Sequence, residues 1–146
     1  MSTIAQRKNE HLDAVLAGGD ARMRTGTGLE SVRFAHVACP ELDLDAIDLS
    51  TTLLGKQLRA PFLISSMTGG PARAADINTH LAIAAQELGI AFAVGSQRVA
   101  LEMAGAGGLD AGLRAHAPDI PLLANLGAAQ LRGADGADRA RRAVEM

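Results

Sequence analysis

Three short apolar runs of the chain each end in a compact polar motif. Residues 60–65 lead into Ser66-Met67-Thr68-Gly69-Gly70, residues 89–94 lead into Gly95-Ser96-Gln97-Arg98, and residues 120–124 lead into Asn125-Leu126-Gly127. The runs are nearly continuous in hydrophobicity and partly β-branched, which is typical of strands buried on both faces of a parallel sheet. The pattern therefore predicts three strands with polar groups just past their carboxyl ends.

Helical patterns separate the three runs. Residues 71–88 keep a helical period, with Pro71 in the first turn and Gly89 as the stop signal. Residues 109–115 form a second expected helix before Pro118, and the chain turns into a third from Leu126 onward. Strands and helices in this order predict an α/β fold, and we expect a partial (β/α)8 barrel. The alternative is a doubly wound open sheet, but its G-x-G-x-x-G phosphate signature does not follow any of the strands.

The first 58 residues precede these units. Residues 4–17 read as a helix that Gly18-Gly19 ends, and residues 18–28 as a mobile loop. A short strand is expected over residues 31–37, followed by short flanking strands that carry Leu42, Leu44, Ile47 and Leu49. We thus expect one incomplete barrel domain over 1–146, with the helix, loop and flanking strands in 1–58 and three to four βα units in 59–146.

Composition excludes several classes of protein. The net charge is −2, Trp and Tyr are absent, and no basic run interleaves with aromatic residues, which disfavours nucleic-acid binding. The single Cys39 cannot form an internal disulfide. No stretch approaches the ~20 apolar residues of a membrane span, and the N-terminus lacks the apolar core of a signal peptide. We expect a soluble cytoplasmic chain without membrane contact.

The polar motifs each allow a functional and a structural interpretation. Ser66 to Gly70 can approach a flat ring closely and hydrogen-bond its polar edge, or can form a tight turn with a serine cap. Arg98 can hold a phosphate through two parallel hydrogen bonds, or can form a structural ion pair. Asn125 can bond a heterocycle or cap a helix. Arg7, Lys8 and His11 share a helical face and can hold an anion, or can form a solvated charged surface.

In combination these motifs resemble one family. The segments are Arg7-Lys8-Asn9-Glu10-His11-Leu12, then Ser66-Met67-Thr68-Gly69-Gly70, then residues 81–89 running on to Gly95-Ser96-Gln97-Arg98. In this order and spacing they closely resemble type 2 isopentenyl-diphosphate delta-isomerase, the flavin-dependent isomerase of isoprenoid biosynthesis. The resemblance extends from Ile4 to about Gly127.

The resemblance implies an FMN-binding β/α barrel that interconverts isopentenyl and dimethylallyl diphosphate. Reduced FMN is the acid–base cofactor, NADPH supplies the reduction and Mg2+ assists the diphosphate; family members are homo-oligomers. The implied flavin contacts are Ser65, Ser66, Met67, Thr68, Ser96 and Asn125. The implied substrate contacts are Arg7, Lys8, Ser96, Gln97 and Arg98, and His11 is a weaker candidate for the diphosphate.

The chain departs from the family pattern at its end. A complete barrel needs about 250 residues, so this chain corresponds to the N-terminal portion and we expect it to be truncated. No catalytic residue is expected within it, and the metal ligand is expected beyond Met146. Acting alone, the chain should bind FMN weakly if at all and show no turnover. Two alternatives stay open: another FMN-dependent β/α-barrel oxidoreductase, such as a 2-hydroxyacid oxidase, or a non-catalytic fragment that needs a complementary half.

Overall fold

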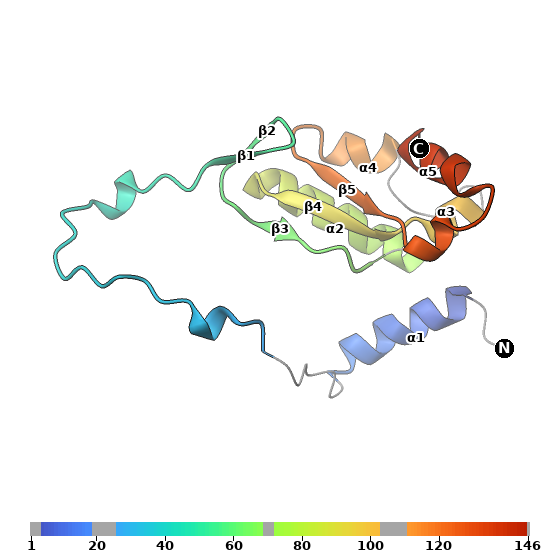
Figure 1. The fold of residues 1–146 in the computed structure, drawn as a ribbon, viewed down its shortest axis with the longest axis horizontal. Helices are drawn as coiled ribbons and strands as arrows, with labels where there is room; N and C mark the ends of the chain where they lie inside the picture. The colour runs from blue at the N-terminus through green and yellow to red at the C-terminus, as the bar shows by residue number, and fades with distance from the viewer. Residues whose placement is uncertain (1–3, 19–25, 69–71, 103–110, 146) are drawn as a thin grey trace.

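A three-stranded parallel sheet forms the centre of the molecule. The computed structural model describes residues 4–18, 26–68, 72–102 and 111–145 (Figure 1). The sheet has the order β3-β4-β5, with β3 at Leu63–Ile64, β4 at Ala91–Ser96 and β5 at Leu122–Asn125. All three strands are parallel and follow the order of the sequence, which confirms the predicted α/β fold with a parallel sheet. The described residues do not close a barrel, so the partial barrel stays a prediction.

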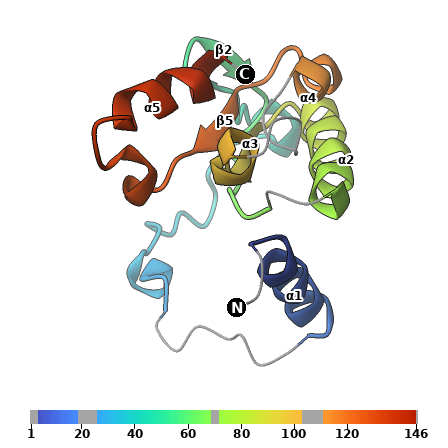
Figure 2. The ribbon, with the colours of Figure 1, turned by 90° about the vertical axis from the view of Figure 1, so that its right-hand side faces the viewer.

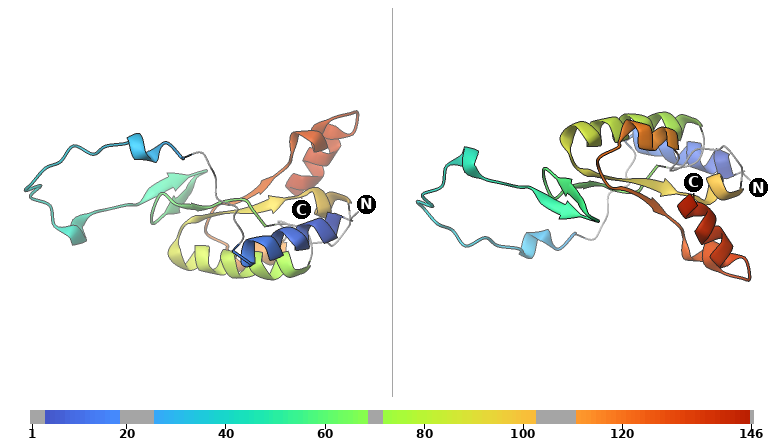
Figure 3. Two further views of the ribbon diagram at one scale, coloured as in Figure 1. Left: turned by 90° about the horizontal axis from the view of Figure 1, so that it is seen from below. Right: turned by 90° about the horizontal axis from the view of Figure 1, so that it is seen from above.

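Two helices cover one face of this sheet. They are α2, Ala72–Leu88, and α4, Ala111–His116, which lie on the same side of the strands (Figure 3). The core between the sheet and the helices contains Phe92, Val94, Ala82, Ala85, Leu113, Ala117 and Ile120. Since alternate residues of a strand face opposite sides, Phe92 and Val94 point to the helices while Ala91 and Ala93 point to the other face. Both faces of β4 are buried, as its continuous apolar run predicts.

The predicted boundary of α2 is confirmed at its carboxyl end. Gly89 has φ +66°, a left-handed conformation that glycine adopts without steric cost. Its carbonyl oxygen accepts a hydrogen bond from the Arg59 backbone N–H at 2.8 Å. The glycine thus ends the helix, and its hydrogen bond to Arg59 ties the helix end to the segment that leads into β3.

A β-hairpin packs at the amino ends of the strands. Its strands are β1, Thr51–Leu53, and β2, Lys56–Leu58, which pair antiparallel around a turn with positive φ at Leu54 and Gly55. The Lys56 ammonium donates to the carbonyl oxygens of Pro118 and Asp119 at 2.9 and 3.0 Å. Leu58 is buried, so the hairpin belongs to the core by packing as well as by hydrogen bonds.

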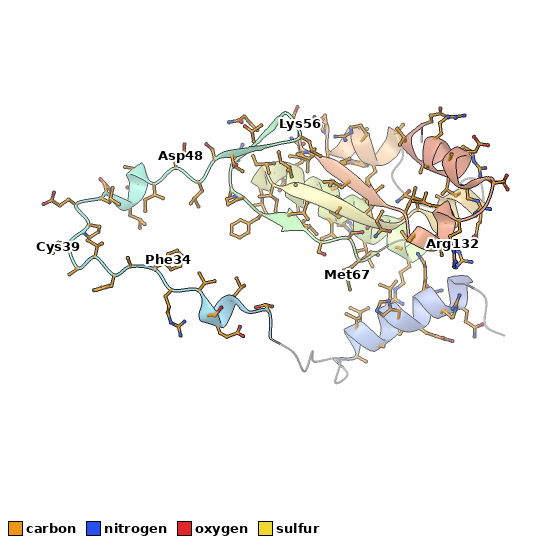
Figure 4. All side chains as sticks on the ribbon, viewed as in Figure 1. Phe34, Cys39, Asp48, Lys56, Met67 and Arg132 are labelled. Carbon is orange, nitrogen blue, oxygen red and sulfur yellow. The ribbon has the colours of Figure 1, made fainter. Side chains whose placement is uncertain are left out.

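The segment before the hairpin differs from the expectation. The strand predicted over residues 31–37 is wrong: Leu29–Ser31 forms the 3-10 turn η1 and residues 32–37 have no regular structure. The expected flanking strands are also wrong, because Leu44–Ala46 forms the 3-10 turn η2, and Leu42, Ile47 and Leu49 lie in no strand. Residues 26–50 extend away from the sheet, and Phe34 is 93% exposed (Figures 1 and 4). A strand needs a neighbouring strand for its hydrogen bonds, and none of the described residues pairs with this segment.

The N-terminal helix is confirmed as α1, Ile4–Leu16, followed by Gly18 with φ +65°. An ion pair between Arg73 Nη1 and Asp13 Oδ1, at 2.6 Å, connects α1 to α2. The loop expected over residues 18–28 lies largely outside the described residues. No helix in the described part of the chain is long and apolar enough to cross a membrane.

Three shorter elements follow the carboxyl ends of β4 and β5. Helix α3, Arg98–Glu102, comes directly after β4, and the 3-10 turn η3, Ala128–Leu131, comes after β5. Helix α5, Gly136–Glu145, follows η3 and packs against both η3 and α3 (Figure 2). The helix expected after Leu126 is therefore present, but a 3-10 turn precedes it.

Candidate functional site

The carboxyl ends of the three parallel strands meet through Ser66. Its hydroxyl donates to the Val94 carbonyl of β4 at 2.5 Å and accepts from Asn125 Nδ2 of β5 at 2.5 Å. Ser66 itself follows β3, so one side chain connects all three strands of the sheet. The parallel order of the strands brings these residues together, because their carboxyl ends lie at one edge of the sheet.

The backbone of Thr68 is held at the same edge. Its carbonyl oxygen accepts hydrogen bonds from the Gly95 N–H at 2.7 Å and from Asn78 Nδ2 at 3.2 Å. Asn78 is buried in α2, and its Oδ1 has no hydrogen-bond partner. Sequence reasoning missed this residue, although it is the one polar side chain on the buried alanine stripe of α2 that includes Ala74 and Ala82. Gly69 and Gly70 of the same motif lie outside the described residues.

Ser96 and Gln97, in the motif at the end of β4, differ in how far they are buried. Ser96 is partly buried, and its Oγ accepts a hydrogen bond from the Arg98 N–H at 3.3 Å. Gln97 is only 1% exposed; its backbone N–H donates to the Asn125 carbonyl, and its Nε2 donates to the Gly95 carbonyl, both at 3.0 Å. Gln97 therefore fixes the ends of β4 and β5 relative to each other.

Arg98 interacts with one acidic and one basic side chain, Glu102 and Lys8. Its Nε donates to Glu102 Oε1 at 2.9 Å, an ion pair within α3. Lys8 of α1 is close enough that Arg98 influences its proton affinity. Burial, and next the positive charge of Arg98, hold the pKa of Lys8 below its ordinary value. Lys8 and Arg98, which are 90 positions apart in the sequence, thus lie near enough for their charges to repel each other.

A small hollow of about 60 Å³ lies where α1 meets the end of β3. It is lined by Lys8, His11, Leu12, Met67 and Thr68. Met67 is 67% exposed, and its side chain extends from the sheet toward α1 (Figure 4). Arg7 is exposed and does not line this hollow. The structure therefore brings Lys8 and His11 to the motif after β3 and leaves Arg7 on the solvent side.

The groups at this edge fit a flat heterocycle with a polar rim. Asn125 is exposed, and among the described contacts only its Nδ2 and its backbone carbonyl are engaged, which leaves Oδ1 as an acceptor. Met67, the residue after Ser66, supplies an exposed, polarizable thioether. Ser66 and Gln97 hydrogen-bond to the side chain and the backbone of Asn125, so its position at this edge is fixed within the chain itself.

Comparison with known proteins shows to which protein family the chain belongs. The sequence pattern of the FMN-dependent dehydrogenases, an FMN-binding family, matches residues 5–110. The chain belongs to this family of FMN-dependent dehydrogenases.

Within this class the chain is similar to isopentenyl-diphosphate delta-isomerases. It is 66% identical over 145 residues to the isomerase of Xanthobacter autotrophicus, covering 99% of this chain and 42% of that relative. It is 65% identical over 144 residues to the isomerase of Stutzerimonas stutzeri, with the same two coverages, and 62% identical over 143 residues to that of Cronobacter sakazakii. The resemblance stated from the sequence is confirmed, and the chain spans 42% of the length of the first two relatives.

Proposed function

We propose that this chain supplies flavin- and diphosphate-binding residues of an isomerase that interconverts isopentenyl and dimethylallyl diphosphate. Its relatives, which are named isopentenyl-diphosphate delta-isomerases, support this activity. The observation that carries the proposal is the Ser66–Asn125 hydrogen bond at the carboxyl ends of three parallel strands, next to the hollow that Lys8 lines together with Met67 and Thr68. Such an arrangement offers a polar edge for a ring and a cation for a diphosphate within one site.

On this proposal the flavin lies against the strand ends. Its contacts are Ser65, Ser66, Met67, Thr68, Ser96 and Asn125. The free Oδ1 of Asn125 accepts a hydrogen bond from a ring N–H, and the exposed thioether of Met67 contacts the ring surface. Ser66 contributes by holding Asn125 in place, because its hydroxyl is already engaged on both sides.

The diphosphate lies between α1 and the β4 motif, held by Arg7, Lys8, Ser96 and Arg98. Gln97 is predicted from the resemblance as a further contact, but it is only 1% exposed and donates to the Gly95 carbonyl, so on this proposal it supports the site by fixing the strand ends. A group with two or three negative charges leaves water only if several cations replace its hydration. The mutual repulsion of Lys8 and Arg98, which helps lower the Lys8 pKa, supports an anion between them. An anion there favours the protonated form of Lys8 and raises its pKa again.

The reaction moves a double bond, so a proton is added at one carbon and removed from another. Bound and reduced, FMN supplies the acid–base chemistry, with NADPH as the source of the reduction. The residues of this chain bind and orient, and none of them is assigned as an acid or a base. Mg2+ would accompany the diphosphate; the described residues contain no group of three side chains that could hold a metal ion, so we assign it no ligand here.

We further propose that β3, β4 and β5 are the first strands of a β/α barrel, within one incomplete domain of residues 1–146. Support comes from the family match and from a β4 that is buried on both faces. The face that carries Ala91 and Ala93 would then face the barrel interior, which side chains fill in such folds. The cytoplasmic location and the homo-oligomer of the complete family members stay predictions.

A chimera tests the proposal. It joins residues 1–146 to the remaining part of the Xanthobacter autotrophicus relative, and isomerisation of isopentenyl diphosphate is assayed with FMN, NADPH and Mg2+. We expect turnover by the chimera and none by the 146-residue chain alone. In the chimera, Lys8→Met and Arg98→Gln should raise KM, because they remove charges that face the diphosphate. A folded, flavin-loaded chimera without turnover would contradict the proposal.

The family name favours one second candidate, an FMN-dependent dehydrogenase acting on a carboxylate substrate. The same chimera distinguishes the two, because a dehydrogenase would reduce bound flavin with a 2-hydroxy acid and ignore the isoprenyl diphosphates. The identities of 62 to 66% to proteins named isomerase favour the first function.

A further inference from the structure

A second, larger hollow lies between α3, η3 and α5. Its volume is about 370 Å³, within the range of small-molecule sites, and three arginines line it: Arg98 of α3, and Arg139 and Arg142 of α5. Among the described residues of the lining, Glu102 is the single carboxylate. Three guanidinium groups and one carboxylate give these described residues a formal charge of +2.

The three arginines differ in how they are held. Arg98 is oriented by Glu102 at 2.9 Å. Arg139 donates from Nη1 to the Gln130 carbonyl at 3.2 Å, and its other contact, to the exposed Asp135, is 4.0 Å long. Arg142 has no ion pair among the described residues. Two guanidinium groups are thus fixed in direction and a third is available to a ligand.

The chemistry of the lining selects one class of ligand. A guanidinium presents parallel N–H donors whose spacing matches two oxygens of a phosphate. The formal charge of +2 balances a phosphate dianion. Leu101 and Ala129 also line the hollow and provide apolar surface for the organic part of a ligand.

We propose that this hollow binds the doubly charged phosphate group of a small organic molecule, with Arg98, Arg139 and Arg142 as its ligands. The inference deepens the proposed function, because Arg98 also belongs to the proposed diphosphate contacts, and it adds Arg139 and Arg142 from α5. The phosphate comes either from the diphosphate substrate or from FMN itself, and the two sources share this chemistry.

The test is calorimetric titration of the 146-residue chain with inorganic diphosphate, repeated with the chimera described above. We expect saturable binding that Arg142→Gln weakens about tenfold, since a charge-assisted hydrogen bond is lost. The matched control is Arg141→Gln, which removes the same charge one residue earlier on α5; Arg141 is exposed, pairs with Asp138 and does not line the hollow. The control should change the affinity less than twofold.

Arg142→Lys adds a second variant that keeps the charge and removes the forked geometry. An affinity between those of the parent and Arg142→Gln supports bidentate binding at this position. Equal losses in Arg141→Gln and Arg142→Gln would overturn the proposal, because the effect would then be one of overall charge. Absence of diphosphate binding by the folded chain and by the chimera would also overturn it.

Titrations of the chimera with FMN and with riboflavin, which lacks the phosphate, separate the two sources. If Arg142→Gln weakens FMN but leaves riboflavin unchanged, the hollow holds the cofactor phosphate. If it weakens diphosphate alone, the hollow holds the substrate. Should both flavins fail to bind while diphosphate binding depends on Arg142, the proposed flavin role fails and the phosphate site stands.

Discussion

The side chains of Ser66 and Asn125 are joined by a hydrogen bond of 2.5 Å although they lie 59 positions apart in the sequence. Ser66 belongs to the turn after β3, Asn125 ends β5, and β4 lies between these two strands. The hydroxyl of Ser66 bridges across β4 by also donating to the Val94 carbonyl. This contact fixes the edge of the sheet at which the proposed flavin contacts gather.

Replacing Ser66 should therefore affect both stability and flavin binding. Ser66→Ala removes a donor to Val94 and an acceptor for Asn125, and we expect a loss of about 1–2 kcal/mol in the free energy of unfolding. In the chimera it should also weaken FMN binding, because the Asn125 side chain is no longer held. The control for stability is Ser65→Ala, whose exposed side chain has no described hydrogen bond and should change the free energy of unfolding by less than about 0.5 kcal/mol. Urea unfolding compares the two variants, and flavin fluorescence compares Ser66→Ala with the parent chimera; equal losses of stability in the two variants would refute the bridging role.

The lowered pKa of Lys8 gives a pH dependence with a definite sign. The unfolded chain keeps this proton up to the ordinary lysine pKa, whereas the folded chain releases it at lower pH. The unfolded state therefore binds more protons in the window between the two pKa values, and the free energy of unfolding rises with pH there. The cost of burying the charge is fully present below the folded pKa. Lys8→Met should remove this rise, which unfolding measurements across the window will show.

The two causes of the Lys8 shift can be separated. Arg98→Gln removes the repulsion by the guanidinium and leaves the burial, so the Lys8 pKa should move part of the way back toward its ordinary value. Carbon-detected NMR of the lysine Cε resonance follows this titration directly. A resonance that titrates at or above the ordinary lysine value in the parent chain would contradict the shift itself.

Gly89→Ala should destabilise the fold through two effects. The φ of +66° costs a residue with a Cβ about 1–2 kcal/mol. The added Cβ would also lie 2.7 Å from Arg59 Cγ and 2.9 Å from Arg59 Cδ, so the Arg59 side chain has to shift. Gly55→Ala is the matched control, because its φ is +76° and no atom lies within 4 Å of the added Cβ. A larger loss at Gly89 than at Gly55, measured by urea unfolding, confirms the contact with Arg59; equal losses show that Arg59 moves aside without cost.

The Arg73–Asp13 ion pair should contribute little to the free energy of unfolding. Its main effect should be to hold α1 against α2. Both side chains are substantially exposed, and such pairs contribute about 0.2–1 kcal/mol. A double-mutant cycle with Arg73→Gln and Asp13→Asn measures this coupling. Because Lys8 is on the same helix as Asp13, either variant should weaken diphosphate binding by the chimera. The exposed pair of Arg141 and Asp138 within α5 is the control, and its removal should leave α1 unaffected.

The sequence alone predicted the central sheet and its polar edge. Strands β3, β4 and β5 and helix α2 follow from local signals: continuous apolar runs, a helical period over residues 71–88, and Gly89 as a stop. The motifs after the strands were found because each polar group follows a buried strand directly. Their convergence follows from the parallel order, which places the carboxyl ends of all strands at one edge.

Only the tertiary structure decided what these side chains contact. The buried position of Gln97, the bond from Asn78 to Thr68 and the repulsion between Lys8 and Arg98 depend on partners that are distant in the sequence or belong to another element. The apolar residues around Val32 and Phe34 read as a strand, but no described neighbour offers them hydrogen bonds, so they stay extended and exposed. Local patterns report which face of an element is apolar, whereas pairing, burial and pKa depend on what packs against that face.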